Sequence, residues 1–263
     1  MRQRFDVWFN NVSLLSVCPN AYIHDIQYEK VQVQPTTKTK PNGHGLVRTS
    51  ERIERSIVRV YVEVHEYSTV ERQNAFQELA RWAMGEGVLE VSDRPGQILY
   101  CSCSSLPMVV SALQWTDAVE ITFTAYEIPF WADKVINYVT INKPDSSTVT
   151  GKIWGAGIAD DPYLEGIITV KSGTATQVTV NVVDVGWMVL DGLNVSPNHT
   201  IEFGTDRTGI FYARSDGVGL LSGLSASSAD NLRLKRGKEN QIAFAAKGAS
   251  SLTLKVGARG LYY

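Results

Sequence analysis

Few side chains of this 263-residue chain have the types and spacing that catalysis requires. The nearest approach to a pair of catalytic carboxylates is the set Asp160, Asp161 and Asp184. Hydrolysis of a glycosidic bond needs two acids about 5–10 Å apart that flank a groove, and the spacing of these three residues does not pair them. They are interpreted as exposed loop acids. Two close acids in a groove would instead indicate an enzyme that acts on a cell-surface polymer.

Motifs for a nucleophile or for phosphate binding are also missing from the sequence. No G-x-S-x-G elbow occurs, so the chain lacks this signature of a serine nucleophile. The segment Gly155-Ala156-Gly157 is not followed by a helical pattern, whereas a phosphate-binding glycine loop leads into a helix N-terminus. The sequence therefore predicts no catalytic residue, no cofactor and no enzymatic activity.

Cysteine and histidine residues are too few and too scattered for a metal site. A structural zinc site needs about four such ligands at short spacing. Cys101 and Cys103 lie two apart on a predicted strand, where side chains point to the same face and a mutual disulfide is disfavoured. An odd cysteine count without a C-x-x-C motif predicts buried thiols in a reducing compartment. The residues concerned are Cys18, Cys101, Cys103, His24, His44, His65 and His199.

Length and composition indicate a globular protein of two domains. The chain exceeds the usual single-domain size of about 100–150 residues, and 44% of its residues are hydrophobic. The formal net charge of −2 gives no electrostatic reason to expect nucleic-acid binding. No apolar signal core and no run near 20 apolar residues is present, so we expect a soluble protein that is made in the cytoplasm and does not insert into a membrane.

The first domain is expected over residues 1–133 and is mostly β with one helix. Val58, Val60, Val62 and Val64 alternate with polar residues, a pattern typical of a half-buried antiparallel strand. A capping box at 68–71 starts a helix over about 68–84, and its apolar stripe, which predicts packing on a sheet, comprises Phe76, Leu79, Ala80 and Ala83. Further strands are expected from the alternation in later segments, among them 109–114.

A polar stretch over residues 35–45 interrupts the strands of this domain. Two prolines and two glycines occur among its lysines and threonines, so the stretch cannot bury much and is interpreted as a loop or an exposed arm. Loops of this length in compact domains are often functional, and contact with a neighbouring subunit is favoured over chemistry. The candidate oligomer-interface residues are Lys38, Lys40, Asn42 and His44.

The second domain, residues 134–263, contains only short strand-like runs separated by turn residues. Turns are expected at 171–173 and 247–248, and a strand is expected at 231–235. This spacing predicts a sandwich of two antiparallel sheets. Four aromatic residues could either pack in the sandwich or form a platform that stacks on sugars and faces a glycan or partner: Trp154, Tyr163, Trp187 and Tyr212.

The order of the pieces in the first domain resembles a known family. A loop with Gly43-His44-Gly45 precedes a charged strand over 52–64, and a helix follows. Then come a short strand at 88–91, the turn Asp93-Arg94-Pro95 and the aromatic junction Pro129-Phe130-Trp131. Segments 166–170, 234–242 and 252–263 are similar to the C-terminal galectin-like sandwich of that family. Over nearly its whole length the chain resembles the distal tail proteins of long-tailed, non-contractile bacteriophages (siphophages) and their prophage relatives.

The resemblance implies a structural virion protein of the tail tip, or baseplate, that is synthesised in the host bacterial cytoplasm. It implies a homo-hexameric ring, built from the first domain, that joins the tail tube protein to the tail hub. The galectin-like β-sandwich would point outward and support receptor-binding proteins for host adsorption. The alternative is a carbohydrate-binding module whose sandwich engages host surface glycans.

Overall fold

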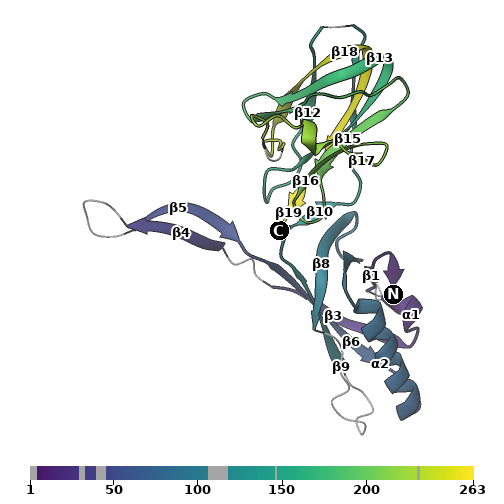
Figure 1. Cartoon of the computed structure of the whole chain (residues 1–263). Helices are drawn as coiled ribbons and strands as arrows, with labels where there is room; N and C mark the ends of the chain where they lie inside the picture. The colour runs from purple at the N-terminus through teal and green to yellow at the C-terminus, as the bar shows by residue number, and fades with distance from the viewer. Residues whose placement is uncertain (1–4, 30–32, 40–45, 106–117, 146, 230–231) are drawn as a thin grey trace. The chain divides into compact units, whose positions relative to one another are not determined.

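The computed structural model describes residues 5–29, 33–39, 46–105, 118–145, 147–229 and 232–263. The chain divides into two compact units, Met1–Trp131 and Ala132–Tyr263. Both units consist mainly of antiparallel strands (Figure 1), which confirms the mostly β fold expected from the sequence. The strand expected at residues 109–114 lies outside the described residues.

The first unit is built on seven strands in the order β2-β1-β7-β8-β9-β6-β3. The four valines at positions 58, 60, 62 and 64 of β6 are all fully buried, as their alternation predicted. Their burial on one face leaves the other face of β6 to polar residues. The strands are β1 (Val7–Phe9), β2 (Val12–Ser13), β3 (Ala21–Tyr28), β6 (Ser56–Val64), β7 (Glu86–Val91), β8 (Gln97–Ser105) and β9 (Ala118–Ala125).

One long helix, α2 (Thr69–Ala83), packs on this unit. Ser68 caps it by accepting the Glu71 amide at 3.1 Å, as the capping box predicted. The Glu71 carboxylate, however, accepts the Ser68 hydroxyl at 2.9 Å rather than a backbone amide. The helix gives way to Gly85, whose φ of +93° is the left-handed conformation that glycine adopts readily. A second helix, α1 (Leu14–Val17), has only four residues and was not expected.

Aromatic and aliphatic side chains join α2 to the sheet. Phe76, Leu79 and Ala83 are buried, whereas Ala80 at the edge of the predicted stripe is only half-buried. The Trp82 ring lies 6.1 Å from both Phe9 of β1 and Phe123 of β9, in edge-on geometry. Such edge-on contacts stabilise aromatic pairs beyond the effect of the area that they bury. The face of the sheet that α2 covers is therefore its core face.

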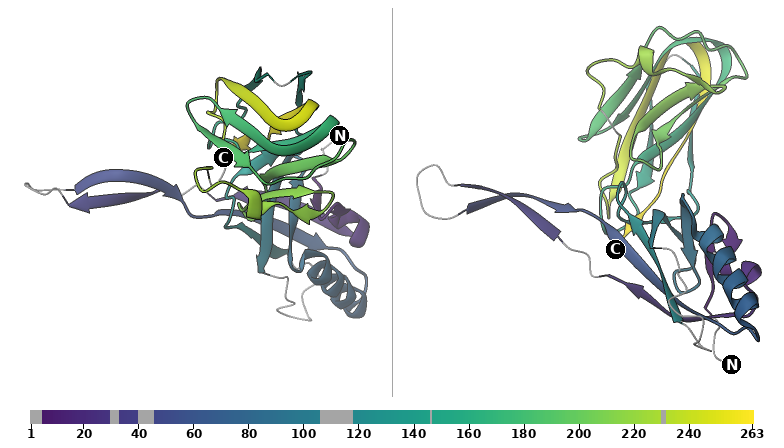
Figure 2. Two further views of the ribbon diagram at one scale, coloured as in Figure 1. Left: turned by 45° about the horizontal axis from the view of Figure 1, so that its top comes forward. Right: turned by 60° about the horizontal axis from the view of Figure 1, so that its bottom comes forward.

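The polar stretch of the first unit is not a loop over its whole length, which corrects one expectation. Residues Val33–Thr39 form β4 and residues Leu46–Ile53 form β5, and the two strands pair with each other in an antiparallel ribbon (Figures 1 and 2). The composition was misleading because threonine has high β propensity, and a strand whose side chains are exposed, as at residues 34–38, needs no apolar face.

The second unit contains two very long strands, β13 and β18, that share most of their length. Both run through a bend, so each contributes to two layers that enclose one core; Figure 2 (left) shows the two strands curving together in green and yellow. The first layer has the order β11-β18-β13-β15-β16-β17 and the second β12-β18-β13-β14. The strands are β11 (Val139–Lys143), β12 (Val149–Trp154), β13 (Leu164–Val182), β14 (Gly186–Leu190), β15 (Thr200–Thr205), β16 (Phe211–Ser215), β17 (Val218–Gly219) and β18 (Glu239–Ala258).

Glycines lie at the bend of β13 and β18, and the turns predicted there from the sequence were wrong. Turns were expected at 171–173 and 247–248, but both segments lie inside continuous strands as bulges. Gly173 and Gly248 have φ of +75° and +81°, values that serve a bulge as well as a turn. A Cβ at Gly248 would sit 2.3 Å from the Thr174 carbonyl oxygen. The two backbones can approach so closely because both positions lack side chains.

The strand expected at residues 231–235 is not formed by the part of it that the structure describes. Leu232 and Leu234 are buried in the core, which explains the strand-like alternation. The backbone nevertheless pairs at a single bridge, Tyr163 with Arg233. The remaining short elements are η1 (Leu221–Gly223) and the paired strands β10 (Trp131–Asp133) and β19 (Leu261–Tyr262).

Candidate functional site

The ribbon of β4 and β5, here called the arm, carries the predicted oligomer-interface residues. Lys38 lies exposed on β4. Lys40, Asn42 and His44 fall outside the described residues, so their role in an interface stays a prediction. The side chains of residues 34–38 are all exposed, so this part of β4 contributes nothing to the core of its own chain.

The arm continues the register of the sheet from which it leaves. Tyr28 of β3 is opposite Val58 of β6, and Val33 of β4 is opposite Ile53 of β5. The second pair lies five positions from the first on each side, so β4 and β5 keep the pairing offset of β3 and β6, although they form a separate two-stranded sheet. A two-stranded ribbon is marginally stable alone in water, and its outer edges offer unpaired backbone groups to another chain.

A stacked cluster lies at the end of β3. The Arg94 guanidinium lies 4.5 Å above the Tyr28 ring and 5.0 Å from the Trp131 ring. The Tyr28 hydroxyl donates to Asp93 at 2.6 Å. Burial, together with the Asp93 carboxylate, raises the pKa of the Tyr28 phenol well above its ordinary value, so Tyr28 remains an uncharged donor. The cluster ties the last residue of β3 to the turn between β7 and β8.

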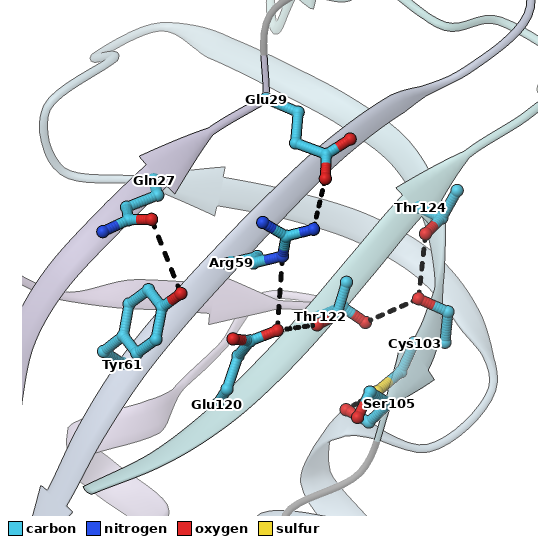
Figure 3. Close-up of polar contacts among 10 residues, drawn as sticks. Gln27, Glu29, Arg59, Tyr61, Cys103, Ser105, Glu120, Thr122 and Thr124 are labelled. Atoms are coloured by element: carbon cyan, nitrogen blue, oxygen red, sulfur yellow. Dashed lines mark hydrogen bonds and ion pairs between the residues drawn. The ribbon is translucent and has the colours of Figure 1, made fainter.

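The polar face of β3, β6 and β9 carries a network of charged and hydroxyl side chains (Figure 3). Arg59 on β6 forms ion pairs with the carboxylates of Glu29 and Glu120, the second at 3.3 Å. Thr122 donates to the same Glu120 oxygen at 2.8 Å. One guanidinium thus balances two acids across the strands, an arrangement suited to charge-assisted contacts between surfaces.

Hydroxyl groups extend this network toward β8. The Ser104 and Thr124 hydroxyls are 2.8 Å apart, and Thr124 is only 3% exposed. On the other side of Arg59, the Tyr61 hydroxyl donates to Gln27 at 3.5 Å. All of these groups are cross-strand neighbours that satisfy one another. The polar groups of this face therefore find their partners within the chain.

The cysteines behave as buried thiols. Cys18 and Cys101 are buried, Cys103 is half-buried, and all three are free. Burial raises the pKa of each thiol, which lowers its thiolate fraction and reactivity. Within the described parts of the chain, no three His, Cys, Asp or Glu side chains gather as a metal site, and no helix is long and apolar enough to cross a membrane.

The four aromatic residues that could either pack in the sandwich or face a glycan or partner are not brought together. Trp154 and Trp187 are 61% and 47% exposed, but they lie on β12 and β14, the opposite edges of one layer. Tyr163 is occupied by Arg233, which stacks 4.2 Å above its ring and donates to its hydroxyl. Tyr212 lies on β16 in the other layer. These residues do not make one platform.

Sequence reasoning did not show that the residues of the Tyr28 cluster and of the polar face meet, although it named Arg94 and Trp131 as pieces of the resemblance. Arg59 and Glu120 stood on the polar positions of predicted strands, so alternation placed them on the surface without showing that they meet. Tyr28, Arg94 and Trp131 come from distant segments. Only the strand register, which a single sequence does not reveal, brings them together.

Comparison by sequence finds no counterpart: no protein-family model and no curated protein matches the chain. Comparison by structure finds several similar proteins. The SPP1 Dit protein (gp 19.1), described as a paradigm of the hub adsorption apparatus in phages infecting Gram-positive bacteria, aligns over 96% of this chain and 98% of its own, with a TM-score of 0.70 and 13% identity.

Chains of the phage P2 baseplate in its activated conformation also align. The structure with Ca gives a TM-score of 0.51 at 10% identity, covering 98% of both chains. The structure with Sr gives 0.53 at 10% identity, covering 97% of both. These likenesses confirm the resemblance at the level of the fold. From end to end, the chain has the fold of a phage tail hub and baseplate component.

Proposed function

We propose that the chain is a distal tail protein of a long-tailed, non-contractile phage, with a structural rather than an enzymatic role at the tail tip of the virion. The observation that carries the proposal is the end-to-end fold likeness to SPP1 Dit, which includes both units. The face with the most organised polar network, around Arg59, pairs its charges internally. That arrangement suits a protein surface that meets other proteins.

The first unit, in this proposal, assembles as a hexameric ring in which each arm reaches a neighbouring subunit. A cyclic ring needs one patch that fits a different patch on the next copy. The arm can supply one of these two patches. Residues 34–38 are exposed, and among the described residues β4 and β5 pair only with each other. Main-chain pairing at its edges would give it a partner without an apolar pocket.

The ring would join the tail tube protein above to the tail hub below, and the second unit would support receptor-binding proteins for host adsorption. The sandwich is suited to this because its core is complete in itself. Its outer faces are therefore free to differ from phage to phage without loss of the fold. A galectin-like origin of this sandwich remains part of the proposal.

Light scattering of the purified full chain tests the ring. The expected mass of the chain alone is near six times 29.0 kDa, and a ring that forms only on the tail tube protein should contain six copies of the chain in the mixed complex. Deletion of residues 36–42 should leave the fold intact, as judged by circular dichroism, and abolish the assembly. A protein that stays monomeric under both conditions, or a deletion variant that assembles like the wild type, would contradict the proposal.

A further inference from the structure

The edge strand β14 of the second sandwich layer is apolar and carries no charge. Its residues, Gly186–Leu190, read Gly-Trp-Met-Val-Leu, and β13 pairs with one of its two edges without a register shift. Native edge strands are commonly protected from pairing with other chains by lysine, proline or a bulge. β14 has none of these. Its outer edge is therefore a template for another strand unless the chain covers it.

The opposite edge of the same layer shows the ordinary protection. The edge strand there is β12, which carries Lys152. The Lys152 ammonium is exposed and forms an ion pair with Glu239 at 2.7 Å. A charged side chain on an edge strand opposes pairing with a second copy. The two edges of one layer thus differ in how they are protected.

Residues 223–229, here called the strap, cover the outer edge of β14. Leu224 forms a bridge with Leu190, and the Ser225 amide donates to the Val189 carbonyl oxygen at 2.9 Å. The strap therefore takes up backbone groups that an incoming strand would need.

Both ends of the strap also bond to this edge. The Asp191 amide, just after β14, donates to the Gly223 carbonyl oxygen at 2.8 Å, and the Ala229 amide donates to the Trp187 carbonyl oxygen at 2.9 Å. Gly223 lies very close to its partner, since a Cβ there would be 2.4 Å from the Asp191 carbonyl oxygen. A side chain at this position would push the strap away from the edge.

In the middle of the strap, the Ser228 side chain takes the place of a strand backbone. The chain turns here, because the Ser228 amide donates to the Ser225 carbonyl oxygen at 2.8 Å instead of to β14. The Ser228 hydroxyl fills the gap: it accepts from the Val189 amide at 3.0 Å and donates to the Val189 carbonyl oxygen at 3.4 Å. One hydroxyl thus closes the centre of the β14 edge.

The strap is held by hydrogen bonds more than by burial. Leu224 and Ala229 are half-buried against the core, and every residue of the strap is either half-buried or exposed. In β14, by contrast, Met188 and Leu190 are fully buried. Segments that bury little apolar surface open at a lower free energy than the core does. The strap is therefore able to leave β14 while the sandwich stays folded.

We propose that the strap is a guard that opens locally, and that the occupant it excludes from the β14 edge is the β14 of a second copy of this chain. In an antiparallel pair centred on Met188, the exposed Trp187 ring of each copy lies across from Val189 of the other. Aromatic and β-branched residues that face each other in this way stabilise antiparallel strands. None of the five residues of β14 is charged, so no repulsion opposes the pairing.

Hydrogen exchange of the full-length chain, resolved to single amides by mass spectrometry, tests whether the strap opens by itself. The Val189 and Asp191 amides bond to the strap, whereas those of Met188 and Leu190 alternate toward β13. In the wild type, the first two should exchange about tenfold faster than the second two, because the strap opens without the sandwich.

A single hydroxyl deletion sharpens this measurement. Ser228→Ala removes the acceptor of the Val189 amide and should speed its exchange about fivefold. Ser227→Ala is the matched control, since the Ser227 hydroxyl lies 3.0 Å from that of Ser225, within the strap. It should change exchange at Val189 by less than about twofold.

Light scattering tests what the open edge binds. Ser228→Ala and Gly223→Ala open the strap by different means, and both should form species of about twice the wild-type mass, because a two-fold contact joins copies in pairs. Adding Trp187→Lys to Ser228→Ala should restore the wild-type mass, since lysine on an edge strand opposes pairing. Exchange at Val189 should stay fast in that double variant.

Either readout can overturn the proposal. Exchange at Val189 and Asp191 as slow as at Met188 and Leu190, or unchanged in Ser228→Ala, would mean that the strap does not open by itself. Opened variants that keep the wild-type mass, or that associate equally well with Trp187→Lys, would mean that the edge does not pair with a second copy. Each mass is compared with that of the wild type, so the outcome does not depend on assembly at a phage tail.

Discussion

Two long antiparallel ladders dominate this molecule, and they end in opposite ways. In the second unit, β13 and β18 are 19 and 20 residues long, pair along most of their length, bend at glycine bulges and close a core between their halves. In the first unit, β4 and β5 keep the pairing offset of β3 and β6 but form a sheet of their own. The inner pair, β3 with β6, carries buried side chains, whereas the side chains of residues 34–38 are exposed.

The difference lies in the side chains rather than in the backbone pairing. Beyond the bend of the sandwich, apolar residues still alternate inward, with Val178, Val180 and Val182 fully buried. Beyond Tyr28, the exposed positions of the arm include Gln34, Pro35 and threonines. A ladder can therefore extend without a core, but only the half that buries apolar surface stabilises its own chain. The other half is available to a neighbour.

The largest effect is expected where the sandwich ladder bends. Gly248→Val places a branched side chain at φ +81° with its Cβ 2.3 Å from the Thr174 carbonyl oxygen. We expect a loss of about 3 kcal/mol or more in the free energy of unfolding, measured by denaturant titration. Gly217→Val is the matched control, since its φ is +85° but no atom lies within 4 Å of a Cβ there.

That control should lose only about 1–2 kcal/mol, from backbone strain alone. Equal losses at Gly248 and Gly217 would show that close packing of the two strands does not hold the bend.

A smaller effect is expected on the polar face of the first ladder. Arg59→Leu leaves Glu29 and Glu120 without the cation that both contact. Because these side chains are about one-third exposed, we expect a loss of only about 1 kcal/mol, reduced further by salt. Arg214→Leu removes a guanidinium that binds a single carboxylate and should cost less. A larger loss at Arg214 would contradict the role given to Arg59.

The sequence predicted those parts of the comparison that depend on local pattern. The valines of β6 and the cap of α2 were read correctly because alternation and capping involve neighbouring residues. The bend at Gly173 and Gly248 was not predicted, because glycine with a positive φ occurs in turns and in bulges alike. Residues 35–45 were interpreted as a loop or an exposed arm, and β4 was not expected there because this stretch shows no apolar alternation. The contact of Glu165 with Arg259 depends on the pairing of β13 with β18, which no local pattern contains.

The pH dependence of stability should differ by less than about 1 kcal/mol between wild type and Glu165→Gln. Burial raises the pKa of Glu165, with Arg259 opposing the shift. A raised pKa means that the folded state holds this proton more tightly than the unfolded chain does. The wild type should therefore lose stability relative to the glutamine variant as pH rises above 4.5, the ordinary value, and the difference should level off once the carboxyl has ionised.

Thermal unfolding at a series of pH values measures this difference. The opposite slope would mean that attraction to Arg259 outweighs burial, and the carboxylate would then be a simple ion-pair partner.

The smallest effect on unfolding is expected on the arm itself. Lys38→Glu reverses a charge on an exposed strand, and Lys247→Glu does the same on an exposed position of β18. Both should change the free energy of unfolding of the monomer by less than about 0.5 kcal/mol. Only Lys38→Glu should reduce the mass of the assembly in light scattering, because only the arm is proposed to contact another copy. A clear loss of monomer stability at Lys38 would instead mean that the arm finds its partner within its own chain.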